Sequence, residues 1–184
     1  MRLGREFYER NTVSVAKDLL GKIFVHKIGN KIVSGIITET EAYRHSDDPA
    51  SHAFRNMTER NKAMFGEVGH AYVYFTYGMY YCVNAVAKSK NFRAGAVLIR
   101  TLEPKDGIDI MIQNRKTDKI SNLTNGPAKL AIALGITKEH YGMDLVRSSH
   151  LYIEHGEING KIISSPRIGI RHATDKLWNF KIRI

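Results

Sequence analysis

Two long runs rich in β-branched residues, 22–28 and 31–43, restrict the fold more than any other feature of the sequence. They flank Gly29-Asn30, a dipeptide that accepts the positive backbone angles of a tight turn, so they predict an antiparallel hairpin. Shorter apolar runs predict further strands at 71–75, 80–87, 96–102, 151–155 and 161–170. These strands favour an antiparallel sheet as the framework of the chain.

Helical patterns recur beside these strands. The first helix is expected to begin at Thr12, its N-cap, and to end at Gly21. Its apolar stripe would consist of Val13, Ala16, Leu19 and Leu20. Two more helices are expected at 107–114 and at 127–134, where Pro127 suits the first helical position. The 184 residues contain no internal repeat or linker, so they predict one α+β unit.

The charge balance favours a polyanionic partner. Lys and Arg number 28 against 18 Asp and Glu, a formal net charge of +10, which suits nucleic acid or an anionic membrane surface. The single cysteine, Cys82, excludes an intramolecular disulfide and a cysteine-rich zinc site, and it indicates a reducing compartment. Residues 1–6 are charged where a signal peptide is apolar, so we expect a cytoplasmic, nucleoid-associated protein, or a nuclear one in a eukaryote.

Residues 68–87 contain no Lys, Arg, Asp or Glu over a length that can cross a bilayer. The stretch includes His70, Asn84, two glycines and five tyrosines, which makes it too polar and too aromatic for a lipid-facing helix. Its middle, Tyr77-Gly78-Met79, is typical of a turn. We therefore expect a buried hairpin here and no membrane partner.

Two carboxylates lie near the end of the second long run. Side chains alternate along an extended strand, so one face would carry Ile37, Glu39, Glu41 and Tyr43. Like charges at this spacing raise each other's proton affinity, which suits a general acid or base. The alternative is a solvated edge that pairs with basic residues. Arg100, at the end of a predicted strand, needs a carboxylate or phosphate partner, and Glu41 is eligible.

Imidazole and carboxylate groups follow directly downstream. His45, Asp48 and His52, together with Glu41, are residue types that bind metal ions. Short polar side chains of this kind also fix turns through hydrogen bonds to the backbone, and Asp48 is then expected to shape the loop that presents His52.

The tyrosine-rich hairpin is expected to be mostly core. Alternation gives each strand one face, which holds Tyr72 and Tyr74 on the first strand and Tyr80, Cys82 and Asn84 on the second. The turn differs, because a hairpin tip is normally wet and polar, whereas Tyr77 and Met79 offer apolar groups. In a basic protein such a tip suits a wedge between the stacked bases of a nucleic acid, or else a dimer contact.

Taken together and in this order, the residues resemble the alkyladenine (3-methyladenine) DNA glycosylase family of base-excision repair. The motifs that carry the resemblance are Glu39-Thr40-Glu41-Ala42-Tyr43, Asp48-Pro49-Ala50-Ser51-His52, Thr58-Glu59-Arg60-Asn61 with Met64-Phe65-Gly66, Tyr72-Val73-Tyr74, Tyr77-Gly78-Met79, Asn84, Val97-Leu98-Ile99-Arg100, Glu103-Pro104, Gly126-Pro127-Ala128-Lys129-Leu130 and Arg167-Ile168-Gly169-Ile170. They run nearly from end to end. The resemblance implies a single glycosylase domain over residues 1–184, with a curved antiparallel sheet, surrounding helices and a protruding hairpin.

The resemblance also implies a monofunctional enzyme without a metal or other cofactor, which leaves an abasic site and a free base. Glu41 would be the general base that activates water, helped by Arg100 and by the backbone carbonyl of Ile168. Ile168 would also be the aliphatic residue beside the pocket. The resemblance therefore argues against a metal site at the histidines, and it makes His52 a stacking partner of the extruded base.

The aromatic residues take their roles from the same resemblance. The residues that would sandwich an extruded purine are Tyr43, His52 and Tyr74. Asn84 would screen the edge of the base, and Tyr77 would fill the gap left in the duplex, with Met79 beside it. The partner would be double-stranded DNA that contains damaged purines, and we expect the chain to act as a monomer.

Two other functions are compatible with the residues taken singly. A metal-dependent nuclease would cut phosphodiester bonds with Glu41, His45, Asp48 and His52. A non-enzymatic nucleic-acid-binding protein would use the tyrosine hairpin as a stacking platform, and it would bind damaged and undamaged DNA alike.

Overall fold

The predicted hairpin forms, and its second strand is the longest of an eight-stranded sheet. In the computed structural model, which describes residues 1–157 and 159–183, β1 (Ile23–Ile28) pairs antiparallel with β2 (Lys31–Arg44). Gly29 has a φ of 59° in the turn between them. One edge of β2 pairs with β5 (Gly95–Asp106), and the other pairs first with β1 and then with β8 (Asn179–Arg183).

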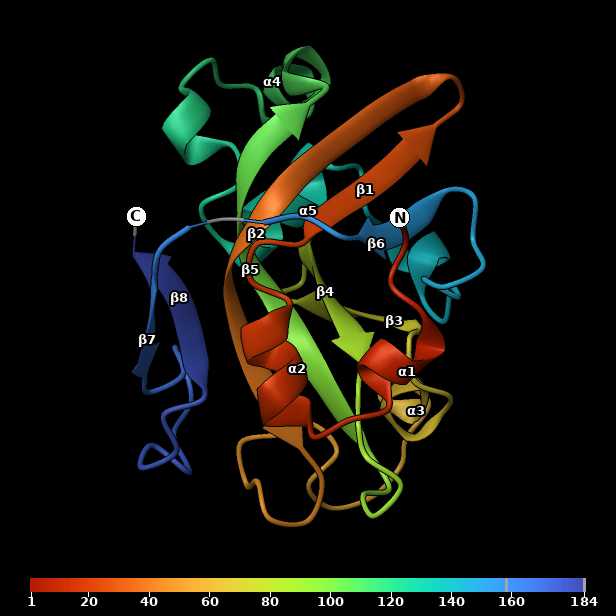
Figure 1. Ribbon diagram of the computed structural model, residues 1–184, viewed down its shortest axis with the longest axis vertical. Helices are drawn as coiled ribbons and strands as arrows, with labels where there is room; N and C mark the ends of the chain where they lie inside the picture. The colour runs from red at the N-terminus through yellow and green to blue at the C-terminus, as the bar shows by residue number, and fades with distance from the viewer. Residues whose placement is uncertain (158, 184) are drawn as a thin grey trace.

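The other strands extend this sheet, and every pairing is antiparallel. They are β3 (Ala71–Thr76), β4 (Tyr80–Val86), β6 (Leu151–Glu154) and β7 (Lys161–Ser165). The main order is β3-β4-β5-β2-β1-β6, while β7 pairs only with β8 among the described strands (Figure 1). The predicted strand 161–170 ends at Ser165, because Pro166 has no N–H to continue the ladder. The strand β8 was not predicted.

In the described residues, five short α-helices and two 3₁₀ turns surround the sheet. They are α1 (Arg5–Tyr8), α2 (Thr12–Asp18), α3 (Lys62–Phe65), α4 (Ile108–Arg115), α5 (Pro127–Ala133), η1 (Ile120–Asn122) and η2 (Lys138–His140). Helix α2 packs on β2 and β5, and α5 packs on β4 and β5. The three predicted helices are therefore confirmed as elements, and with the curved sheet they confirm the α+β prediction.

The start of α2 differs from the prediction. Its N-cap is Asn11, whose side chain accepts a hydrogen bond of 2.9 Å from the Val13 N–H. Thr12 is buried instead, and its hydroxyl donates to the carbonyl of Ala87 at 2.9 Å. Because the contact with Ala87 turns Thr12 inward, Val15 rather than Val13 joins the fully buried stripe.

An irregularity in β2 changes which of its side chains share a face. Ile37 pairs with Leu102 and Glu39 with Thr101, so Thr38 is an extra residue in the ladder. Such a bulge reverses the alternation of side chains beyond it. Ile37 consequently packs in the main core and does not share the face of Glu39 and Glu41, contrary to the prediction.

Residues 71–86 form β3, β4 and their turn, which confirms the predicted hairpin. Its burial is only partial, because Phe75, Tyr77, Met79 and Tyr80 are exposed. Across the part of the chain that the structure describes, no helix is long and apolar enough to span a bilayer.

The substitution Asn11→Ala tests the start of α2. It should lower the free energy of unfolding by about 1 kcal/mol, because the Val13 N–H loses its side-chain acceptor. Urea denaturation measures the loss. Gln113→Ala, at an exposed position of α4, is the control and should leave the midpoint nearly unchanged. Equal midpoints for both variants would contradict the assignment of the cap.

Candidate active site

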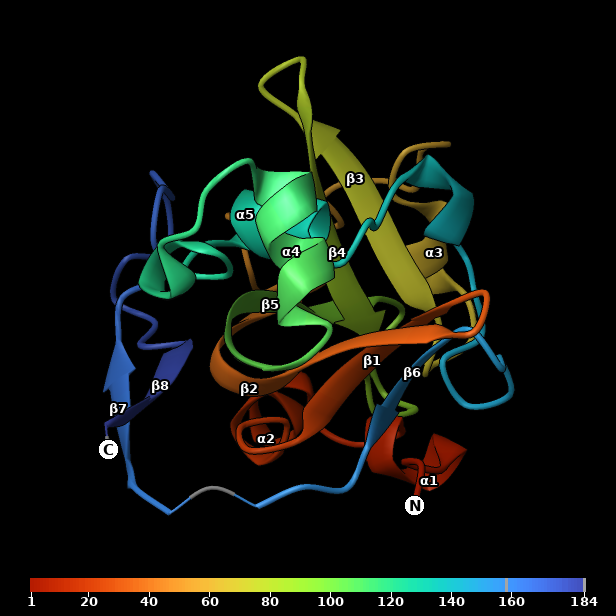
Figure 2. The same cartoon turned by 90° about the horizontal axis from the view of Figure 1, so that it is seen from above.

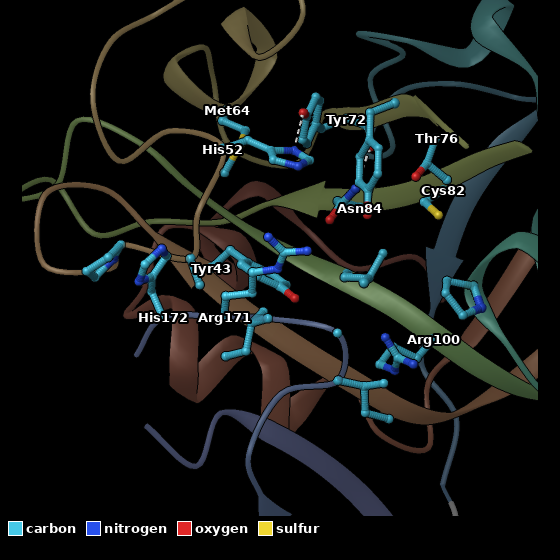
Figure 3. Close-up of a pocket in the computed structure, with 18 of the residues that line it drawn as sticks. Tyr43, His52, Met64, Tyr72, Thr76, Cys82, Asn84, Arg100, Arg171 and His172 are labelled. Carbon is cyan, nitrogen blue, oxygen red and sulfur yellow. Dashed lines mark hydrogen bonds between the residues drawn. The ribbon is translucent and has the colours of Figure 1, made fainter. Parts of the chain in front are cut away.

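A cavity of about 430 Å³ opens between the C-terminal end of β2, the hairpin β3–β4 and the loop that follows β7. Such a volume lies in the range of about 300–1,000 Å³ found for small-molecule sites. The described residues that line it, most of them drawn in Figure 3, are Tyr43, Pro49, Ala50, His52, Met64, Tyr72, Tyr74, Thr76, Tyr77, Cys82, Asn84, Leu98, Arg100, Pro127 and 168–172. Nearly all the predicted site residues meet here, although their roles stay predictions.

Glu41 is fully buried and receives four hydrogen bonds. The Ile168 N–H and Asn179 Nδ2 donate to Oε1 at 2.7 and 3.0 Å. The Tyr43 hydroxyl and Arg100 Nη1 donate to Oε2 at 2.8 and 3.3 Å. Of the Ile168 backbone, the N–H contacts Glu41, and the role of the Ile168 carbonyl in activating water stays a prediction. Four donors satisfy an ionised carboxylate, which suits a charge held out of water.

Glu39, the other carboxylate of β2, is also buried, and it shares both of its partners with Glu41. Arg100 Nε donates to Glu39 Oε1 at 3.1 Å, and Asn179 Nδ2 donates to the same oxygen at 2.8 Å. The predicted pairing of Arg100 with Glu41 is thus present. The alternative of a solvated edge is wrong, because Glu39 is only 6% exposed and Glu41 is not exposed at all.

Arg100 owes its direction to a second bulge. Thr101 pairs with Glu39 and Ile99 with Thr40, so Arg100 is the extra residue in β5. Bulges of this kind redirect a side chain, and they occur often beside active sites. The guanidinium forms part of the cavity wall together with Tyr43 and Ile168. Glu41 contacts all three of these residues but does not itself line the cavity, so it lies directly behind this wall.

Aromatic side chains occupy two sides of the cavity. In Figure 3, Tyr43 lies on one side and His52, Tyr72 and Asn84 lie on the other. The ring centroids of His52 and Tyr74 are 4.7 Å apart, and His52 Nδ1 shares a hydrogen bond of 2.9 Å with the Tyr72 hydroxyl. Burial lowers the pKa of His52, which favours the neutral imidazole. Burial also raises the pKa of Tyr43 and of Tyr74, so both rings stay uncharged.

The floor of the cavity follows the predicted alternation of the hairpin. Tyr72 pairs with Asn84 and Tyr74 with Cys82 across β3 and β4, and all four side chains line the cavity. Asn84 Nδ2 donates to the carbonyl of Tyr72 at 2.9 Å, so the amide is held in place. Asn84 is 3% exposed, which puts it at the closed end of the cavity.

The turn of this hairpin is exposed and apolar, as predicted. Tyr77 is 88% exposed and Met79 is 63% exposed. Tyr77 and Gly78 have φ values of 52° and 68°, so a tyrosine occupies the left-handed region that usually favours glycine. The loop projects beyond the sheet (Figure 2), and Tyr77 also lines the mouth of the cavity.

The histidine and carboxylate cluster is organised differently from a metal site. Asp48 pairs with Arg167 and accepts hydrogen bonds from the N–H groups of Arg44 and Ala50 at 3.0 and 3.3 Å. It therefore shapes the loop before His52, as predicted. His45 Nδ1 contacts the carbonyl of Ala53 at 2.8 Å. Over residues 1–157 and 159–183, no three His, Cys, Asp or Glu side chains lie together as a metal site.

Several residues of the site were not predicted from the sequence. Asn179 contacts both carboxylates, but it belongs to the unpredicted strand β8. Arg167 was named only as part of a motif, and its buried pair with Asp48 spans 119 residues. Arg171 and His172 line the cavity and were not singled out. None of these residues stands in a local pattern that indicates its partner.

Comparisons with known proteins give one consistent result. Residues 6–184 match the sequence model of the methylpurine-DNA glycosylase family. A protein of Chlorobaculum tepidum is 47% identical over 179 residues, 96% of this chain and 85% of its own length. Proteins of Clostridium acetobutylicum and Carboxydothermus hydrogenoformans are 44% and 46% identical over all of this chain, which covers 95% and 96% of their lengths.

All three relatives carry the name "Putative 3-methyladenine DNA glycosylase". Their identities and coverage confirm the resemblance found in the motifs. The cavity with its buried Glu41, the order of the motifs and these full-length matches agree, and the chain belongs to the methylpurine-DNA glycosylase family.

Proposed function

We propose that this DNA glycosylase hydrolyses the N-glycosidic bond of alkylated or deaminated purines of the 3-methyladenine type in duplex DNA, and that it leaves an abasic site for base excision repair. One observation carries the proposal: a fully buried carboxylate, Glu41, lies directly behind a cavity with aromatic walls. A purine needs such walls, and hydrolysis needs such a carboxylate.

The purine must first leave the duplex, because its glycosidic bond is hidden within the base stack. Extrusion costs a few kcal/mol and costs least where damage has already weakened pairing. Tyr77 is suited to fill the gap, since it is 88% exposed on a projecting turn at the cavity mouth. Met79, on the same turn, would contact the neighbouring base step. The +10 charge of the chain supports binding to the phosphate backbone.

Tyr43 and Tyr74 would then hold the base between them and His52. A ring-alkylated purine carries positive charge, and an aromatic face attracts a cation by about 0.5–2 kcal/mol. Both phenol groups stay uncharged because burial raises the pKa of each. The walls would therefore favour a charged lesion over neutral adenine.

Glu41 would act as the general base. As the bond breaks, the sugar gains oxocarbenium character, which a nearby carboxylate stabilises while it removes a proton from water. All four acceptor positions of Glu41 are occupied, so water must replace one donor. Arg100 makes the longest of these contacts, at 3.3 Å, and would give way most easily.

Water, rather than an amine, is the nucleophile in this proposal. No lysine is among the described residues that line the cavity. Lys129, the lysine of the Gly126–Leu130 motif, is only partly exposed, and its Nζ donates to Asn125 Oδ1 at 2.8 Å. The geometry supports hydrolysis without a covalent enzyme–DNA intermediate.

Glu41→Gln tests the role of the carboxylate. It should slow release of free base from alkylated duplex DNA by about 10²–10⁴-fold, because an amide cannot accept the proton from water. Single-turnover release of free base in EDTA measures the rate. The DNA strand should stay intact during the reaction and be cut only when hot alkali is added afterwards. Glu139→Gln, at an exposed position, is the matched control. A wild-type rate in Glu41→Gln would refute this role, and DNA already cut before alkali would indicate a nuclease.

Asn84→Ser tests how the closed end of the cavity selects bases. A buried polar atom without a partner costs about 1–3 kcal/mol, so crowding by Asn84 would reject the exocyclic 2-amino group of guanine. The smaller serine should raise the release of guanine-type bases relative to adenine-type bases. Competition between the two lesion types in one duplex gives this ratio directly, and an unchanged ratio would make Asn84 a structural residue.

Cys82 reports whether a base enters the cavity, since it lines the cavity and is the single cysteine of the chain. Burial raises the pKa of its thiol, so little thiolate exists near neutral pH and reactivity rises as the pH increases. We expect slow labelling by an aromatic disulfide reagent and further protection by lesion-containing duplex. Undamaged duplex should protect little, and Cys82→Ser gives the blank. Equal protection by both duplexes would contradict base flipping into this cavity.

A further inference from the structure

The most deeply buried ion pair of the described chain lies beside this site. Arg167 Nη1 and Nη2 donate to the two oxygens of Asp48 at 2.7 and 2.6 Å, and neither side chain has exposed surface. Nη1 also donates to the carbonyl of Ala42 in β2 at 2.8 Å. The pair therefore ties the segment after β7 to the end of β2.

Stability alone gives little reason for such a pair. Burial removes water from both charges, and replacement of a buried pair by uncharged residues of similar volume is often neutral or stabilising. Other ion pairs of the described chain keep more contact with water. Arg5 and Asp144, for example, pair at 2.6 Å with side chains 22% and 23% exposed, and neither lines the cavity.

Arg167 lies beside a hydrogen-bond donor for each oxygen of Glu41. The next residue, Ile168, donates its N–H to Glu41 Oε1 at 2.7 Å, so the anchored guanidinium sets the position of that peptide. The same guanidinium carbon lies 4.6 Å from the ring centroid of Tyr43, whose hydroxyl donates to Oε2 at 2.8 Å. One cation thereby holds a donor for each oxygen.

Asp48 in turn positions the loop on the opposite wall of the cavity, the wall that contains His52. It accepts hydrogen bonds from the Arg44 and Ala50 N–H groups, and its carbonyl accepts one from the Ser51 N–H at 2.9 Å. These bonds fix the turn that precedes His52. The pair thus joins the wall that contains Tyr43 to the loop that presents His52.

We propose that Asp48 and Arg167 act as one positioning unit, which holds the carboxylate of Glu41 and the spacing of Tyr43 and His52 in the arrangement needed for base release. This inference rests on the function proposed above. Displacement of a reacting group by about 1 Å can lower a rate by about 10²-fold. The unit should therefore affect the chemical step more than the binding of DNA.

The test is the double variant Asp48→Asn with Arg167→Met, which removes both charges and keeps an acceptor for the backbone N–H groups. We expect single-turnover base release to slow by about 10- to 100-fold. The dissociation constant for an uncleavable abasic-analogue duplex and the melting temperature should change little. This split between rate and binding distinguishes positioning from a general loss of structure.

The matched control is Asp144→Asn with Arg5→Met, which removes the Arg5–Asp144 pair. This variant should release base at the wild-type rate. A wild-type rate in the Asp48 and Arg167 variant would overturn the inference. Equal rate losses in both double variants, accompanied by lower melting temperatures, would overturn it too.

Should the first double variant fail to fold, Arg167→Lys keeps a cation but cannot donate two parallel hydrogen bonds. A slower rate with unchanged binding supports the inference in that variant, and a wild-type rate overturns it. Failure of the wild-type protein to release base from any alkylated duplex would overturn the proposed function and, with it, this inference. An active wild type with an unaffected variant overturns the inference alone.

Discussion

The burial of one negative charge, that of Glu41, constrains the whole structure. A carboxylate without water is tolerable only with several hydrogen-bond donors, and Glu41 has four. They come from β2 itself, from β5, from β8 and from the loop after β7. Because β5 and β8 pair with opposite edges of β2, the sheet order brings these distant segments to one carboxylate.

The bulges in β2 and β5 let one pair of strands serve both the core and the site. Before Thr38, β2 directs Ile37 into the main core, and beyond it Ala42 takes that place, while Glu39 and Glu41 share the other face and both contact Arg100 and Asn179. Thr40 remains tied to α2, since its hydroxyl donates to the carbonyl of Ala16 at 2.6 Å. The irregularities are therefore part of how the site is built.

The cavity and its supports follow the chemistry expected of the methylpurine-DNA glycosylase family. Apolar and aromatic groups suit a purine, while Glu41 lies behind the wall and Arg100 is paired with Glu39 and Glu41. The exposed aromatic tip is the exception, because Tyr77 has no protein surface to cover it. In the proposed function, the stacked bases and phosphates of duplex DNA would account for this combination of a basic chain and an uncovered ring.

Local patterns by themselves determined the central hairpin, the other strands up to residue 165, three helices and the apolar hairpin tip, because turn residues and hydrophobic periodicity act between near neighbours. The four-residue helices α1 and α3 are too short for a periodic signal, and β8 exists through its pairing with β2 and β7. The position of Arg100 at the end of a predicted strand was enough to name Glu41 as an eligible partner. Only the tertiary structure decided that Asn179 bridges two carboxylates and that Asp48 meets Arg167, because hydrogen bonds between residues more than a hundred positions apart depend on how the strands are ordered in space.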